Sequence, residues 1–190
     1  MPSQSPRPQI NRLVVGIAGR IGAGKTSAAT YLSSKHGFQY LRYSQVLSEW
    51  LAKDFDKKSR LQEIGWEVMD GGMQVELNRR LIAQIKPDAD VAVDGLRHPT
   101  DNESLRNSFG GSFHLVYIES PAKQRWEHLK GRGRYADFAS FQAADSHPVE
   151  QQIETLRSSA ARVLDNGSSL DILYSELEKV IKEFSKEGGK

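Results

Sequence analysis

Apolar residues along this chain follow two patterns that alternate through its length. Short apolar runs, such as residues 13–18 and 113–118, are typical of strands that are covered on both faces. Longer segments, such as residues 26–36, repeat apolar residues at the spacing of a helix face. This alternation predicts parallel strands joined by helical crossovers.

Five segments fit strands, namely 13–18, 38–43, 91–93, 113–118 and 162–164. Helical patterns cover 26–36, 46–55, 61–85 with a break near Gly71 and Gly72, 100–110, 121–130, 147–159 and a last segment from about 169. One face of that last helix carries Leu170, Leu173, Leu177, Val180, Ile181 and Phe184. We therefore expect an α/β fold, a three-layer α/β/α sandwich around a five-stranded parallel sheet.

Several predicted helix ends carry capping signals. Gly37 suits the carboxyl-terminal cap of the helix at 26–36. Thr100, followed three residues later by Glu103, predicts a capping box. Ser120 before Pro121 predicts an N-cap and a proline in the first turn.

Length and composition favour one soluble domain. A chain of 190 residues suits a single core, which we place at residues 12–185. Residues 1–11 are polar and have no apolar secretion signal, so we expect a disordered tail and a cytoplasmic protein. No apolar run is long enough to span a membrane, and a formal charge of +2 does not indicate a nucleic-acid partner. With no cysteine, disulfides and thiolate metal sites are excluded.

The segment after the first predicted strand carries the most specific motif. It reads Gly19-Arg20-Ile21-Gly22-Ala23-Gly24-Lys25-Thr26 and fits G-x-x-x-x-G-K-[ST] between a strand and a helix. Glycines let backbone N–H groups point at phosphates, and the helix amino terminus adds a positive dipole. We expect Lys25 to reach the β- and γ-phosphates of ATP or GTP, and Thr26 to bind Mg2+. The nucleotide-binding set is Gly19, Gly22, Ala23, Gly24, Lys25, Thr26 and Ser27. A chance glycine-rich turn is the alternative.

Two residues near the end of the third predicted strand suit a phosphoryl-transfer site. Asp94 should lie at the carboxyl edge of the sheet, where ligands bind in open α/β folds, and could hold Mg2+ or orient the attacking group. Arg97 could grip an acceptor phosphate. The alternatives are a turn aspartate and a lone surface arginine.

Two later segments suggest loops that close over a nucleotide. Lys130, Arg132 and Arg134 are separated by glycines, which would allow a mobile lid at about 131–147, although such clusters are also ordinary solvated charge. Asn166 and Gly167 follow the last strand and could pack against the purine or form an ordinary turn. The tryptophans at 50, 66 and 126 fall in helical patterns and fit the core or a groove wall.

These residues together resemble those of the small P-loop kinases, which include nucleoside monophosphate kinases, dephospho-CoA kinases and related uncharacterised archaeal and bacterial proteins. Besides the glycine-rich loop, the segment from Asp94 to Arg97 resembles the Asp-Gly-x-x-Arg of adenylate kinases, and that from Asp165 to Leu170 a late motif of dephospho-CoA kinases. The resemblance covers almost the whole chain. It implies a P-loop NTPase fold with a mobile lid, in which Arg132 and Arg134 belong to the lid and Arg97 faces the acceptor.

The chain departs from that pattern in two places. Monophosphate kinases commonly carry Gly-Asp-x-x-Arg after the second strand, whereas residues 44–48 here contain neither the acid nor the arginine. Arg42 or Arg60 could take that place. We expect the helical region at about 44–86 to bind the acceptor. Before Asp145, where the family has a second lid arginine, this chain has Ala144.

The expected function is ATP- and Mg2+-dependent phosphoryl transfer to a small nucleotide or nucleotide-like acceptor, with dephospho-CoA kinase-like activity as a variant. The alternative is a regulatory NTPase or switch without kinase activity. The chain has no Asn-Lys-x-Asp for guanine, and a nucleic-acid end kinase would need a longer basic groove. The sequence leaves open the acceptor, the donor base, and whether the protein is a monomer or a homodimer.

Overall fold

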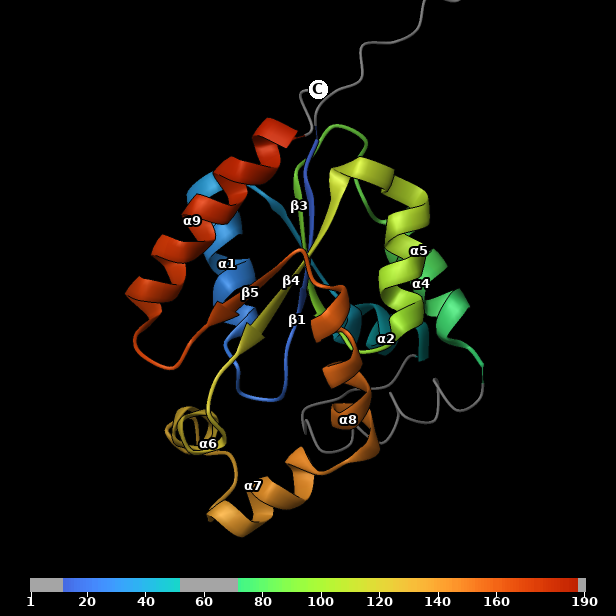
Figure 1. Cartoon of the computed structure of the whole chain (residues 1–190). Coiled ribbons are helices and arrows are strands. Elements are labelled where there is room, and N and C mark those ends of the chain that lie inside the picture. The colour runs from blue at the N-terminus through green and yellow to red at the C-terminus, as the bar shows by residue number, and fades with distance from the viewer. Residues whose placement is uncertain (1–11, 52–71, 188–190) are drawn as a thin grey trace, which may run out of the picture.

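The computed structural model describes residues 12–51 and 72–187. Its five strands are β1 (Val14–Ala18), β2 (Gln39–Arg42), β3 (Val91–Leu96), β4 (Phe113–Glu119) and β5 (Arg162–Asp165). They form one sheet in the order β2-β3-β1-β4-β5, and every neighbouring pair is parallel (Figure 1). The predicted five-stranded parallel sheet is therefore confirmed.

The helices between the strands are α1 (Lys25–His36), α2 (Tyr43–Leu51), α4 (Gln74–Ala83), α5 (Pro99–Phe109), α6 (Ala122–Lys130), α7 (Phe138–Asp145) and α8 (Pro148–Thr155), and α9 (Leu170–Glu187) follows the last strand. Two short 3-10 helices, η1 (Gly110–Ser112) and η2 (Arg157–Ser159), precede β4 and β5. Helices α1 and α9 lie on one side of the sheet, and α2, α4 and α5 lie on the other (Figure 1). This is the predicted three-layer sandwich.

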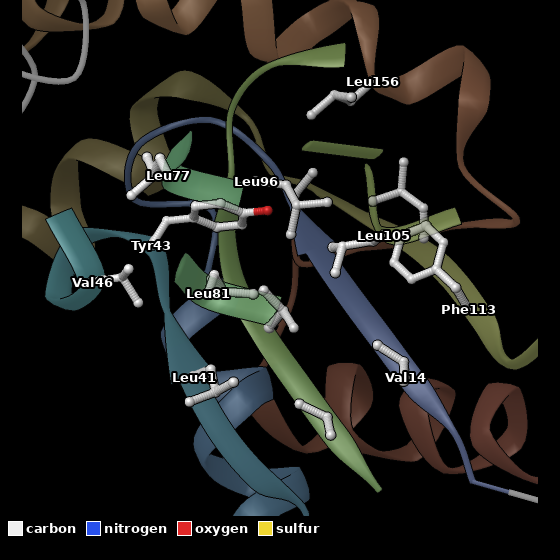
Figure 2. Packing of buried hydrophobic residues seen from close by; sticks show 14 of the residues in the cluster. Val14, Leu41, Tyr43, Val46, Leu77, Leu81, Leu96, Leu105, Phe113 and Leu156 are labelled. Atoms are coloured by element: carbon white, nitrogen blue, oxygen red, sulfur yellow. The ribbon is translucent and has the colours of Figure 1, made fainter. Parts of the chain in front are cut away.

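Each face of the sheet has its own apolar cluster. On the α2, α4 and α5 face, Tyr43, Leu81 and Leu105 pack with strand residues such as Leu96 and Phe113 (Figure 2). On the other face, α1 and α9 bury Leu32 and Phe184 against β1 and β4. Because both faces are covered, β1 is buried at every position, as its unbroken apolar run predicts.

Strand β3 contains one extra residue. Ile17 of β1 pairs with Asp94, whereas Ala18 pairs with Leu96, so Gly95 bulges out of the ladder. Its φ of 92° is readily adopted only by glycine. The strand runs on to Leu96, past its predicted end at Val93.

Two of the three predicted caps are wrong in detail. Gly37 caps α1 as expected, its N–H donating to Ser33 O at 3.1 Å. The capping box of α5 consists of His98 and Asp101 in place of Thr100 and Glu103, because Pro99 takes the first helical position. Helix α6 begins one residue later than expected, which makes Pro121 the residue before the helix and leaves Ser120 outside it.

Two other expectations change. The sequence predicts no helix in the lid segment at about 131–147, but α7 begins at Phe138, where the Asp137 side chain accepts a hydrogen bond from Ser140 N. Leu170 is 41% exposed because it is the first residue of α9, so it does not share the buried stripe of that helix.

Some expectations fall outside the described residues, namely those for the tail at 1–11, Arg60, Trp66 and Gly71. Trp50 packs against the first apolar cluster, and Trp126 packs with Phe138, which agrees with their reading as core or wall. None of the helices in residues 12–51 and 72–187 is long and apolar enough to cross a membrane.

Candidate active site

The loop between β1 and α1 has the backbone that its glycines predict. Gly19, Gly22 and Gly24 have φ values of 146°, 80° and 105°. Gly24 is confined as well, since a Cβ there would lie 2.5 Å from Asn166 Nδ2. Helix α1 begins directly afterwards at Lys25, so the positive end of its dipole faces the loop.

The side chains of this loop are held against its own carbonyl groups. The buried Lys25 donates from Nζ to Gly19 O at 2.6 Å and Arg20 O at 3.0 Å. Ala23 is also buried, and its N–H donates to Arg20 O at 3.1 Å, which closes the turn. Ser27 lines the cavity in front of the loop.

Thr26 and Asp94, the residues predicted to hold Mg2+, are in direct contact. The carboxylate of Asp94 is 5% exposed, and its Oδ2 accepts a hydrogen bond from Thr26 Oγ1 at 2.8 Å. Tyr40 OH donates to the same oxygen at 2.8 Å, and Arg42 Nε lies 3.8 Å from it. Burial, followed by the neighbouring Asp94 charge, raises the pKa of the Tyr40 phenol. Hydroxyl and carboxylate oxygens are ligands that Mg2+ prefers, so this pair fits that ion.

Arg97 is joined to the glycine-rich loop through a buried glutamate. Glu150 of α8 is fully buried, and its Oε1 accepts from Arg97 Nη1 at 2.9 Å. Its Oε2 accepts from Ile21 N of the loop at 2.8 Å. One carboxylate therefore ties Arg97, α8 and the loop together.

The two predicted lid arginines differ in their surroundings. Arg132 is exposed and lines the cavity. Arg134 is partly buried, and its Nη1 is enclosed without a hydrogen-bond partner among the described residues. Burial, together with the positive charges of Arg132 and Arg97, lowers the pKa of Arg134. The positive charges of Arg97 and Arg132 therefore lie close enough to Arg134 to affect it.

The segment after these arginines is anchored to the glycine-rich loop. Asp145, at the end of α7, accepts from Arg125 Nη1 at 2.6 Å and Nη2 at 2.9 Å, and Arg20 Nε lies 3.2 Å away. Arg125 also donates to Ile21 O at 3.0 Å. Phe141 of α7 is fully buried in the small cluster beside the loop. Of the predicted lid, residues 138–145 are therefore docked, and the arginines lie in the turn before them.

The predicted purine turn contacts the glycine-rich loop. Asn166 is buried, and its Nδ2 donates to Ala23 O at 2.9 Å. Its backbone N–H donates to Glu119 O at 2.8 Å, at the end of β4. Gly167 N donates to Asp165 Oδ1 at 2.9 Å, which forms a tight turn.

A cavity of about 270 Å3 brings most of these residues together. Beside the loop it is lined by Thr26, Ser27 and Asn166, and from β2, α2 and α4 by Arg42, Leu47 and Leu77. Its lining also includes Gly22, Gly24, Lys25, Asp94, Arg97, Arg132, His128 and Leu170. The donor loop and the predicted acceptor side thus open into the same space.

The floor of the acceptor side is a buried polar network. Asp101 accepts side-chain hydrogen bonds from Gln74 and Asn78, and Asn78 in turn accepts from Tyr43 OH. The other oxygen of Asp101 accepts from Arg97 N at 2.9 Å. Burial raises the pKa of this carboxyl group, against the opposing effect of its hydrogen bonds. The network joins α2 and α4 to the chain that carries Arg97.

Most of the predicted loop residues line this cavity, and so do the predicted Asp94, Arg97, Arg132 and Asn166. Arg134, Gly19, Ala23 and Gly167 lie in the surrounding layer. Tyr40, Glu150 and Arg125 were not predicted. Tyr40 could have been found from its strand, because residues two positions apart share a face and Arg42 of the same strand pairs with Asp94.

Comparison with known proteins places this fold in a family. The profile of the AAA domain family matches residues 15–144, from β1 to the end of α7. The chain belongs to the AAA domain family. Its relatives and its fold are those of P-loop small-molecule kinase-like proteins.

Relatives of similar length support this placement. A UPF0200 protein of Pyrobaculum aerophilum is 28% identical and covers 90% of this chain and 97% of its own. A dephospho-CoA kinase of Frankia casuarinae is 27% identical, with coverage of 87% and 81%. Among solved structures, shikimate kinase from Acinetobacter baumannii in complex with shikimate superposes with a TM-score of 0.62 over 91% of this chain and 93% of its own. At 16% sequence identity, this likeness shows a shared fold alone.

Proposed function

We propose that this protein is a kinase that transfers a phosphoryl group from ATP, with Mg2+, to a small nucleotide or nucleotide-like acceptor. The observation that carries the proposal is the single cavity shared by the glycine-rich loop and Arg97. A donor and an acceptor that bind in this one cavity would be held close together, and positioning supplies much of the rate in phosphoryl transfer.

The donor end would hold the triphosphate. Backbone N–H groups from Gly22 to Thr26 and the amino terminus of α1 would contact the phosphates, and Lys25 would exchange its two carbonyl partners for phosphate oxygens. Mg2+, held by Thr26 and through Asp94, would neutralise charge on the transferred group. Asn166 would support the loop from the side of the base.

The acceptor end would recognise an anionic group. Arg97 is presented towards the cavity by Glu150 and Asp101, and Arg42 takes the place of the missing arginine after the second strand. Arg132 lines the cavity and would contact an anionic group bound there, whereas Arg134 lies in the layer behind it.

Which small molecule accepts the phosphoryl group can be proposed only by analogy with related proteins. The dephospho-CoA kinase among them makes dephospho-CoA one candidate, and nucleoside monophosphates are another. The apolar walls formed by Leu47 and Leu77 are compatible with a base or pantetheine-like group.

The test is ATP consumption with Mg2+ against nucleoside monophosphates, nucleosides, dephospho-CoA, shikimate and gluconate, with an acceptor-free control. We expect ADP formation that depends on one nucleotide-like acceptor. Lys25→Ala should abolish it while the fold is kept, and Lys35→Ala, an exposed position on the same helix, should not. Acceptor-independent hydrolysis alone would favour the regulatory NTPase, and unchanged turnover by Lys25→Ala would refute the site.

A further inference from the structure

We propose that Tyr40 is a positioning residue, which orients the Asp94 carboxylate for the divalent cation. The inference rests on the cation site of the proposed function and adds to it a residue from the neighbouring strand. Tyr40 does not contact the reacting groups in this role. It acts through the oxygen atom that it shares with Thr26.

The sheet brings Tyr40 and Asp94 to the same place. Strand β2 pairs with β3 so that Tyr40 lies beside Ala92, and Arg42 lies beside Asp94. Tyr40 and Ala92 both pack into the cluster on the α1 face of the sheet. From there the long tyrosine side chain reaches forward along the strand, and its phenol meets the carboxylate at 2.8 Å.

Two hydrogen-bond donors and one positive charge converge on one carboxylate oxygen. Tyr40 OH and Thr26 Oγ1 each lie 2.8 Å from Asp94 Oδ2, and Arg42 Nε lies 3.8 Å from it. In the described part of the chain, no residue donates a hydrogen bond to Oδ1. Two short hydrogen bonds to one oxygen fix the rotation of the carboxylate, and they leave Oδ1 as the oxygen for a cation or for its bound water.

The chemistry of the phenol suits this role. The phenol has a proton to donate and a carboxylate has none, so Tyr40 donates and Asp94 accepts. Such a hydrogen bond from a neighbouring residue holds a carboxylate in the orientation in which it can bind a cation. Thr26 can donate to this oxygen while its lone pairs bind Mg2+, and Tyr40 adds a second donor that is not itself a predicted metal ligand.

Removing only the hydroxyl separates this role from packing. The ring of Tyr40 packs at the edge of the apolar cluster, and Tyr40→Phe keeps that ring. Tyr31 offers a matched control on the same face of the sheet, since its hydroxyl also donates to a carboxylate, Glu178 Oε1, at 2.8 Å. Tyr31 lies on α1 and stacks on Tyr174 of α9, and it does not line the cavity.

The experiment measures cation binding apart from turnover. Mn2+ binding to the full chain saturated with ADP is followed by electron paramagnetic resonance, and ADP binding in EDTA is measured by displacement of a fluorescent nucleotide. We expect Tyr40→Phe to weaken Mn2+ binding by about 10-fold or more, as other residues that orient metal ligands do. ADP binding in EDTA should be unchanged, and Tyr31→Phe should match the wild type in both measurements.

The outcomes separate this inference from the proposed function. Mn2+ binding by Tyr40→Phe that equals the wild type overturns the role of Tyr40 and leaves the kinase proposal intact. An equal loss of ADP binding in EDTA also overturns it, because the tyrosine would then support the nucleotide site as a whole. A weakened Mn2+ site in a protein that shows no acceptor-dependent turnover supports the role of Tyr40 and refutes the kinase. Absence of Mn2+ binding by the wild type refutes both.

Discussion

Replacing Glu150 with alanine should destabilise the protein through two groups at once. The carboxylate is fully buried between Ile21 N and Arg97 Nη1. Its removal leaves the Ile21 N–H without this acceptor, which costs about 1–3 kcal/mol for a buried donor. Loss of one partner of a buried ion pair costs about 3–5 kcal/mol, but Arg97 is 31% exposed and can turn partly to solvent. We therefore expect a total loss of about 2–4 kcal/mol.

Urea unfolding followed by circular dichroism gives the free energy of unfolding directly. Glu150→Gln keeps one carbonyl oxygen for Ile21 N and should recover part of the loss. Gln151→Ala, at an exposed position on the same helix, should change stability by less than about 0.5 kcal/mol. Glu150→Ala should also raise the KM for ATP, because the loop is no longer held at Ile21. A loss no larger than that of Gln151→Ala would show that the buried carboxylate does not stabilise the loop.

Three further predictions test other parts of the structure. Gly24→Ala should weaken ATP binding at least 10-fold, since the φ of Gly24 is positive and a Cβ there would meet Asn166. Gly111→Ala should leave ATP binding unchanged, because a Cβ at Gly111 has no atom within 4 Å, and equal ATP affinity of the two variants would contradict this prediction. Phe141→Ala should cost about 3–5 kcal/mol in urea unfolding, because α7 loses its fully buried ring, and a loss below about 1 kcal/mol would mean that α7 is not docked. Burial lowers the pKa of His114, so the unfolded chain takes up this proton first and the protein loses stability as pH drops below about 6.5. His114→Phe keeps an aromatic ring against Phe184 and should show a smaller fall in Tm between pH 7 and pH 5 than the wild type. A fall equal to that of the wild type would refute the assignment.

The centre of the sheet could be predicted because β1, β3 and β4 are mostly buried on both faces. A short, fully apolar run such as β1 is typical of a central parallel strand, and the motif beside it identifies the loop that follows. Boundaries were harder to predict, since they depend on single contacts. The predicted start of α5 is wrong because the N-cap is His98, whose side chain accepts the hydrogen bond from Thr100 N, and histidine is not among the residues that usually indicate an N-cap.

Helix α7 was missed because its polar neighbours dominate the pattern. The arginines at 132 and 134 suggested a mobile lid. Asp137 was overlooked as an N-cap signal for a helix that begins at Phe138. The buried ring of Phe141 then shows that tertiary packing, which the local sequence does not display, holds the helix against the loop.

The candidate site was predicted where its residues are close in sequence. The glycine-rich loop and the segment from Asp94 to Arg97 are short motifs whose chemistry can be read directly. Glu150 is 129 residues from Ile21, and Tyr40 is 54 residues from Asp94. Contacts over such separations depend on strand register and helix docking, so composition and spacing could not reveal them.

The extra residue at Gly95 sets which side chains reach the cavity. Along β3, Val91 and Val93 face one apolar cluster and Ala92 faces the other, so an unbroken alternation would carry Leu96 to the side of Asp94. The bulge at Gly95 shifts this alternation by one residue. Leu96 therefore packs in the same cluster as Val93, and Arg97 lines the cavity together with Asp94. Loss of this single glycine would exchange an arginine and a leucine between solvent and core. The distance of three residues between Asp94 and Arg97 is thus a requirement of the fold, and a deletion there would be far less tolerable than a substitution.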